Sequence, residues 1–102
     1  MSIKPEKFEE YWGYKYVCFE DGTVLFCDAA STSHSHKQLV DERPNLKAIS
    51  AGKIKVREKK WQMGEGGSMT AKLPSLAGDE AMIDKVLKPF GYSMNDGEYW
   101  YF

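Results

Sequence analysis

The sequence has little of what marks secreted, membrane-spanning or polyanion-binding proteins. It contains only two cysteines, and its 14 basic and 15 acidic side chains leave a net charge of -1. Because no overall field draws such a chain to nucleic acid or to an anionic membrane, binding of a polyanion would have to be local. No apolar run approaches the ~18 residues of a membrane span, and residues 1–10 carry charges where a signal sequence has an apolar core. We therefore expect a cytoplasmic protein that does not enter a membrane.

What the chain does have is the composition of a globular domain. Hydrophobic residues make up 42% of the sequence and charged residues 28%, which is enough apolar surface to support folding. The length of 102 residues suits one hydrophobic core and not two. We expect a single domain that spans residues 1–102.

Two apolar runs joined by Asp21-Gly22 predict a β-hairpin from residue 14 to residue 28. A two-residue turn at this dipeptide would place Cys18 opposite Leu25. Cys27 would then lie diagonally from Cys18 on the same face, at roughly 7 Å, which is poor geometry for a disulfide. The sequence therefore predicts two reduced thiols in the core.

Basic residues on the expected strands need partners or solvent. The same two-residue turn would place Lys15, on an otherwise apolar strand, opposite Asp28, so a cross-strand ion pair is expected. In segment 53–59, lysine and arginine alternate with apolar residues and form a basic stripe, with Trp61 close by. Such a stripe is usually a solvated face, and the alternative interpretation is a surface that binds single-stranded nucleic acid.

The remaining pattern combines strands with two helices, which makes the expected fold class α/β (α+β). The expected elements are a helix from His36 to about Arg43, strands Leu46–Ser50 and Lys53–Arg57 with a bulge at Ala51-Gly52, a return strand through Trp61 and Met63, a helix from Asp79 to Lys88, and a last strand or hairpin around Asn95-Asp96-Gly97.

His36 is the first candidate for chemistry. Ser35, followed three residues later by Gln38, has the form of a capping box and places His36 in the first turn of a helix. Free backbone N–H groups there suit an anion such as phosphate, and their field would keep the imidazole neutral near pH 7. The alternative interpretation is an ordinary surface histidine that follows a helix cap.

The glycine-rich segment 64–67 leads into Ser68, Met69 and Thr70. Glycines allow successive N–H groups to point into one concavity, where they could hold an oxyanion. The alternative is a flexible exit from a hairpin.

A zinc site is not expected. His34 and His36 lie near Cys27 and Asp28 in the sequence, but no second pair of ligands follows at the spacing of a zinc finger.

Five short segments, taken in order, resemble the janus/ocnus family of small phosphohistidine phosphatases. His36 followed by Leu39 resembles the family's active-site histidine at a helix start. The other similar segments are Tyr14-Lys15-Tyr16-Val17, Gly52-Lys53-Ile54, Gly67-Ser68-Met69, and Asn95-Asp96-Gly97 with Tyr99.

The resemblance implies a single mixed β-sheet flanked by two helices and a metal-free phosphatase that uses no cofactor. His36 would act as nucleophile or general base, and a shift of the match by two residues would give that role to His34. The partner would be a phosphorylated protein or a small phosphoramidate, with phosphohistidine or phospholysine as the reacting group. Lys15 and Lys53 would neutralise the charge of the phosphate, and backbone N–H groups near Lys37, Ser68, Met69 and Thr70 would complete the binding site.

Two functions of other classes stay open on the sequence alone. One is a non-catalytic module of the same fold that binds an anion or a protein. The other is single-stranded nucleic-acid binding through the basic stripe of segment 53–59 and Trp61.

Overall fold

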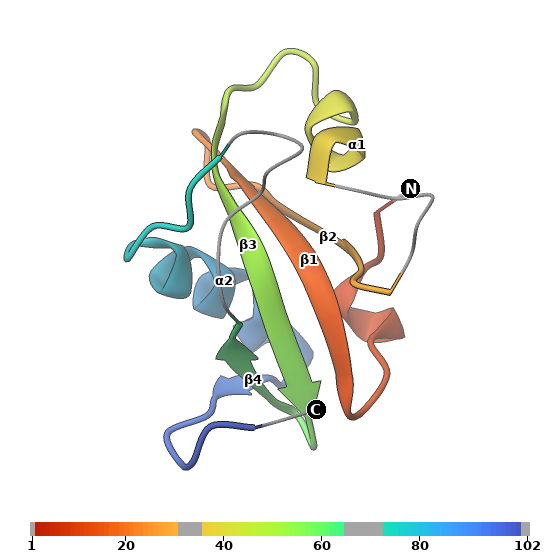
Figure 1. The fold of residues 1–102 in the computed structure, drawn as a ribbon, viewed down its shortest axis with the longest axis vertical. Helices are drawn as coiled ribbons and strands as arrows, with labels where there is room; N and C mark the ends of the chain where they lie inside the picture. Colours follow the sequence, from red (N-terminus) through yellow and green to blue (C-terminus); the bar gives the residue numbers. More distant parts are fainter. Residues whose placement is uncertain (1, 31–35, 65–72, 101–102) are drawn as a thin grey trace.

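A computed structural model describes residues 2–30, 36–64 and 73–100 (Figure 1). Its sheet has the strand order β2-β1-β3-β4-β5, and every pairing is antiparallel except the parallel pairing of β4 with β5. The expected mixed sheet with two α-helices is therefore confirmed. The elements are η1 (Pro5–Lys7), β1 (Trp12–Phe19), β2 (Val24–Asp28), α1 (His36–Asp41), β3 (Ala48–Arg57), β4 (Lys60–Met63), α2 (Asp79–Leu87), η2 (Lys88–Phe90) and β5 (Ser93–Met94).

The alternation of side chains along β1 builds a core on each face of the sheet. On the α1 face, Leu39 covers Val17, Phe19 and Ala51. α2 covers the other face of the sheet (Figure 1). It contributes the buried side chains of Ile83 and Leu87 to the core there. The core under α2 is the larger and contains Tyr14, Tyr16, Cys18, Val24, Phe26, Ile54, Val56, Trp61, Ile83, Leu87 and Tyr92.

The prediction of a two-residue turn at Asp21-Gly22 is wrong. The N–H of Phe19 donates to the carbonyl of Thr23, so the loop between the strands has three residues. Gly22 closes it with a φ of 93°, a left-handed angle that glycine adopts without strain.

One extra loop residue shifts the register of the hairpin by one. Lys15 consequently lies opposite Cys27, and Asp28 lies opposite Tyr14, so the predicted pairing of Lys15 with Asp28 is wrong. The shift also puts Cys18 and Cys27 in the cores on opposite faces, not on one face. Both thiols are free, as expected, but the physical reason is that the sheet separates them.

Two details beyond the hairpin also differ from expectation. β3 is continuous through Ala51-Gly52, and the irregularity falls at Ile49, because Cys18 pairs with Ser50 while Phe19 pairs with Ala48. Of the expected last strand or hairpin, the strand is present as β5, but within the described residues segment 98–100 forms no second strand to pair with it. β5 instead pairs in parallel with β4.

Gly52 is required by the packing of Tyr16. A Cβ atom at Gly52 would lie 2.7–2.9 Å from the hydroxyl and ring atoms of Tyr16. We therefore expect Gly52→Ala to lower the free energy of unfolding by about 1–3 kcal/mol, the usual cost of overpacking a core. Chemical denaturation measures this, and Gly78→Ala is the matched control because a Cβ there meets nothing within 4 Å. Equal stability of the two variants would contradict the packing argument.

Among the described residues, no helix is long and apolar enough to cross a membrane.

Candidate functional site

Two lysines from neighbouring strands face the start of α1. Lys15 on β1 and Lys53 on β3 are direct cross-strand partners, so their side chains leave the same face of the sheet. This is the face of Val17, which α1 covers. Both lysines act electrostatically on His36, the first residue of α1. We call His36, Lys15 and Lys53 the His36 site.

The imidazole of His36 is held by the backbone of β3. Its side chain is buried, with 6% of its surface exposed, and Nε2 lies 2.8 Å from the carbonyl oxygen of Gly52. Because a carbonyl only accepts hydrogen bonds, Nε2 carries the proton and donates it. In the neutral ring, Nδ1 then keeps its lone pair, so Nδ1 is the nitrogen available as base or nucleophile.

The surroundings favour this neutral form. Burial lowers the pKa of His36 below its ordinary value, and the positive charges of Lys15 and Lys53 lower that pKa further. The hydrogen bond to the Gly52 carbonyl opposes them but does not reverse the shift. His36 is therefore neutral at pH 7, next to two cations that would attract a phosphoryl group.

This electrostatic arrangement predicts the behaviour of His36 in a titration. The pKa of His36 in the wild type should lie below the ordinary value for histidine, and Lys53→Gln should raise it because one repelling charge is removed. NMR titration of the ring protons measures both, with the His34→Gln variant assigning the two imidazoles. Lys60→Gln, an exposed lysine on β4, is the control and should leave the His36 pKa unchanged. An unchanged pKa in Lys53→Gln would refute the proximity of the two charges.

The structure brings together only part of the predicted phosphate site. Lys37 follows His36 in α1, so the predicted role of the backbone N–H groups near it stays a prediction. Its side chain takes no part in the His36 site, because its ammonium group lies 3.5 Å from the exposed Asp41 carboxylate. Ser68, Met69 and Thr70 lie outside the described residues, and so does the alternative histidine, His34. The cap predicted for α1 at Ser35 also falls there.

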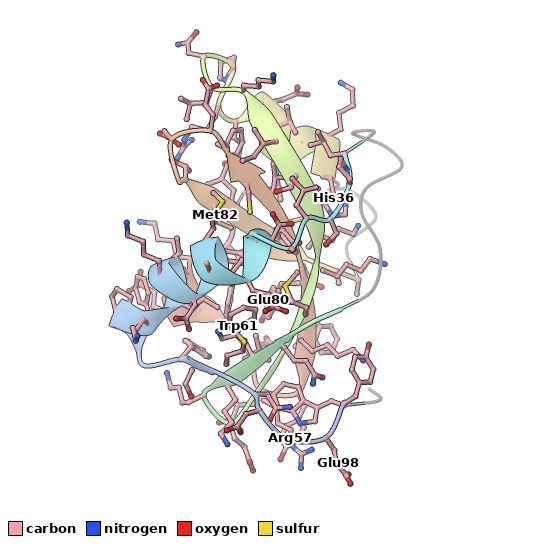
Figure 2. The ribbon with its side chains drawn as sticks, turned by 90° about the vertical axis from the view of Figure 1, so that its left-hand side faces the viewer. His36, Arg57, Trp61, Glu80, Met82 and Glu98 are labelled. Atoms are coloured by element: carbon pink, nitrogen blue, oxygen red, sulfur yellow. The ribbon has the colours of Figure 1, made fainter. Side chains whose placement is uncertain are left out.

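Trp61 is not placed for the alternative function, binding of single-stranded nucleic acid together with the basic stripe. Trp61 has 0% of its surface exposed and packs in the core under α2, because it pairs with Val56 across β3 and β4. In Figure 2, His36, which belongs to α1, lies apart from Trp61. The basic stripe of segment 53–59 therefore has no base-stacking partner in Trp61.

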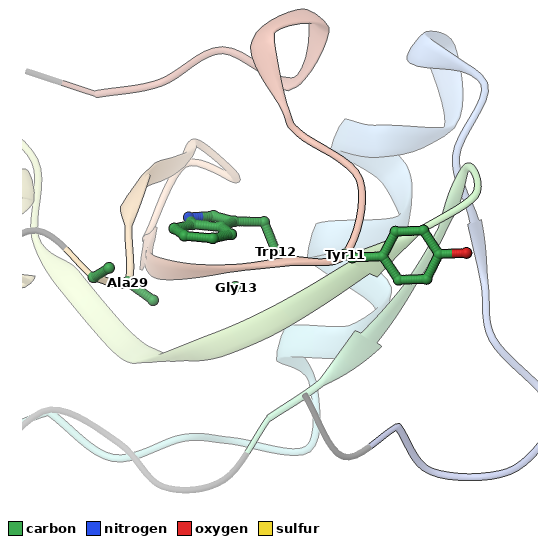
Figure 3. Close-up of a pocket in the computed structure, with 5 residues that line it drawn as sticks. Tyr11, Trp12, Gly13 and Ala29 are labelled. Carbon is green, nitrogen blue, oxygen red and sulfur yellow. The ribbon is translucent and has the colours of Figure 1, made fainter.

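The sequence did not predict two hollows near the His36 site, of which the first is lined by a residue of that site and the second adjoins the first. One, of about 280 Å³, is lined by Gly13, Ala29, Lys53 and Tyr99, among others. The second, of about 410 Å³, shares Gly13 and Ala29 and is bounded by Trp12 (Figure 3). The sequence does contain two small residues, Gly13 and Ala29, next to aromatic residues. Only the pairing of β1 with β2 shows that Gly13 and Ala29 lie side by side.

A buried carboxylate on the other face of the sheet also escaped prediction. Asp79, at the start of α2, is 1% exposed. Its Oδ2 accepts hydrogen bonds from the Tyr16 hydroxyl at 2.6 Å and from the Leu76 N–H at 3.0 Å, and its Oδ1 accepts one from the Ser50 hydroxyl at 2.5 Å. Burial, followed by the bond to Asp79, raises the pKa of Tyr16. These groups are fully engaged with one another and form a structural network.

The two thiols are not reactive near neutral pH, and the described residues contain no group of possible metal ligands. Burial raises the pKa of the Cys18 thiol to about 11 and also raises that of Cys27, so neither is a thiolate near neutral pH. In residues 2–30, 36–64 and 73–100, no three or more histidine, cysteine, aspartate or glutamate side chains are grouped to hold a metal ion.

Comparison of this chain with models of known protein families, with curated proteins and with solved structures gave no match. The similarity to the janus/ocnus family therefore stays a prediction made from short segments, and the geometry of the His36 site carries the functional argument.

Proposed function

We propose that this protein is a metal-free phosphatase that removes the phosphoryl group from phosphohistidine or phospholysine in proteins. The observation that carries the proposal is a histidine whose Nε2 is held by the Gly52 carbonyl, whose Nδ1 keeps its lone pair, and whose pKa is lowered by burial and, further, by two neighbouring lysines. The same lysines would neutralise charge on the phosphoryl oxygens. These parts suit phosphoryl transfer, where positioning and charge stabilisation supply most of the catalysis.

Nδ1 of His36 could act by two routes, as a general base or as a nucleophile. As general base, Nδ1 of His36 takes a proton from water while the water oxygen bonds to phosphorus and the P–N bond breaks. The proton then passes to the departing nitrogen, and orthophosphate is released. As nucleophile, Nδ1 bonds to phosphorus while the P–N bond of the substrate breaks and the departing nitrogen takes a proton from solvent. Water then hydrolyses the phosphorylated His36, which releases orthophosphate and restores the free imidazole.

The test is release of inorganic phosphate from phosphohistidine and phospholysine substrates by the wild-type protein, with a chelator present throughout. Turnover in the chelator supports the proposal, and transient phosphorylation of His36, detected by mass spectrometry, separates the two routes. Absence of turnover would refute the enzyme. In that case phosphate-dependent NMR shifts at His36 and Lys53 would identify a non-catalytic anion-binding module.

A further inference from the structure

We propose that the two hollows around Gly13 and Ala29 bind the polypeptide that carries the phosphoryl group, and that they select a large apolar or aromatic side chain two residues from the phosphorylated one. This inference rests on the function proposed for the His36 site. It adds a specificity-determining surface to that site.

The strand register places the hollows at the required distance. Gly13 and Lys15 are two residues apart on β1 and face the same side of the sheet, which separates them by about 7 Å. Across the sheet, Lys53 lies opposite Lys15 and Lys55 lies opposite Gly13. Side chains of an extended peptide also repeat on one side every two residues. If the substrate peptide runs along β1 with its phosphoryl group at Lys15 and Lys53, the peptide residue two positions from the phosphorylated one lies over Gly13.

The two hollows exist because the residues that they share, Gly13 and Ala29, are the two smallest residue types. Gly13 has no side chain, and Ala29 contributes one methyl group. A Cβ added to Gly13 would lie 3.5 Å from the Ala29 Cβ, an ordinary contact distance. A Cβ therefore fits at position 13, and the larger side chain of Gly13→Val would extend from it to fill the hollow.

Two aromatic side chains bound the outer hollow and are fixed in place before any ligand arrives. Trp12 is 38% exposed, yet its indole Nε1 donates a hydrogen bond of 2.8 Å to the Asp28 carboxylate. Tyr11 has a left-handed φ of 58°, and its hydroxyl donates to the Glu58 carboxylate at 3.1 Å. In Figure 3, the Trp12 ring lies on the side of Ala29, and the ring of Tyr11, the residue before β1, extends in a different direction. Such preorganisation lowers the entropic cost of binding.

Charge complementarity indicates the occupant. Lys53 belongs to the His36 site and also lines the inner hollow, so the two form one continuous surface. Lys55 lines the inner hollow as well, but its ammonium group donates to the Trp100 carbonyl and lies 4.2 Å from the centre of the Tyr99 ring. A ligand that matches this surface carries an anionic group and, about 7 Å away, an apolar one. A phosphorylated peptide with a neighbouring aromatic residue has this arrangement, whereas a free phosphoramidate has only the anionic end.

The test uses two phosphohistidine peptides that differ only in having Phe or Ala two residues on either side of the phosphohistidine. Burial of the phenyl group should give the Phe peptide a kcat/KM about 10–100-fold higher in the wild type. Trp12→Ala and Gly13→Val should each bring this ratio close to 1. Phe90→Ala, which removes an aromatic side chain of similar exposure on η2, is the control and should preserve the ratio.

Two further measurements separate this inference from the proposed function. Hydrolysis of a small phosphoramidate reports on the His36 site alone, since that substrate has no side chain to place in the hollow. Binding of both peptides, followed by the Trp12 indole N–H resonance, needs no turnover. Tighter binding of the Phe peptide without hydrolysis would uphold the docking surface and refute the enzyme. Equal kcat/KM and equal binding of the two peptides would overturn the docking surface.

Discussion

Replacement of His36 by glutamine is expected to lower kcat for phosphohistidine hydrolysis by about 10²–10⁴-fold, the range for loss of a positioned proton-transfer group. Glutamine keeps an N–H group that can donate to the Gly52 carbonyl, as Nε2 of His36 does. It has no basic nitrogen to replace Nδ1. The variant should therefore keep the fold of α1 and lose the chemistry.

Initial rates of phosphate release in a chelator measure this effect, together with the midpoint of thermal unfolding for each variant. His34→Gln is the matched control and should retain the wild-type rate. Full activity in His36→Gln, combined with loss of activity in His34→Gln, would transfer the catalytic role to His34. Full activity in both variants would remove histidine from the mechanism.

Local patterns were sufficient to predict most of the fold. The helical spacing of apolar residues predicted a helix from Asp79 to Lys88, and α2 spans Asp79–Leu87. A capping pattern and the following proline predicted a short helix that starts at His36, and α1 does start there. Both signals act within a few residues, because side-chain periodicity and helix termination are local properties of the chain.

Errors arose where one residue of register or a distant contact decided the structure. The Asp21-Gly22 dipeptide suits both two-residue and three-residue loops, and the choice between them moved Lys15 from Asp28 to Cys27. Ala51-Gly52 looked like a bulge because glycine weakens a strand. In the fold, Gly52 instead makes room for the ring of Tyr16.

The candidate site was predicted only in part, because its geometry also depends on contacts between residues that are distant in the sequence. The pairing of Lys15 with Lys53 follows from antiparallel contact between β1 and β3, which lie far apart in the sequence. The resemblance to a family had named both lysines, but no local pattern places them side by side. The hollows at Gly13 and Ala29 depend on this long-range pairing as well, so the sequence held their residues without showing that they meet.

Removal of the Asp79 carboxylate is expected to lower the free energy of unfolding by about 3–5 kcal/mol. Asp79→Ala would remove the acceptor of the Tyr16 and Ser50 hydroxyl groups, whose residues are 0% exposed, and of the partly buried N–H of Leu76. Hydrogen bonds to a charged group contribute about 1.5–3 kcal/mol each, and buried donors left unpaired add a desolvation cost. The loss is expected to exceed that of any exposed substitution on α2.

Chemical denaturation of Asp79→Ala, Glu80→Ala and the wild type measures the effect. Glu80 is exposed in the same first turn, so its replacement controls for the loss of a negative charge near the helix N-terminus and should cost no more than about 1 kcal/mol. A double-mutant cycle with Tyr16→Phe should show coupling, because the two side chains share one hydrogen bond. Equal stabilities of Asp79→Ala and Glu80→Ala would show that the network does not hold α2 on the sheet. A large difference would mean that Asp79 fixes Tyr16 over Gly52, on the opposite side of β3 from His36.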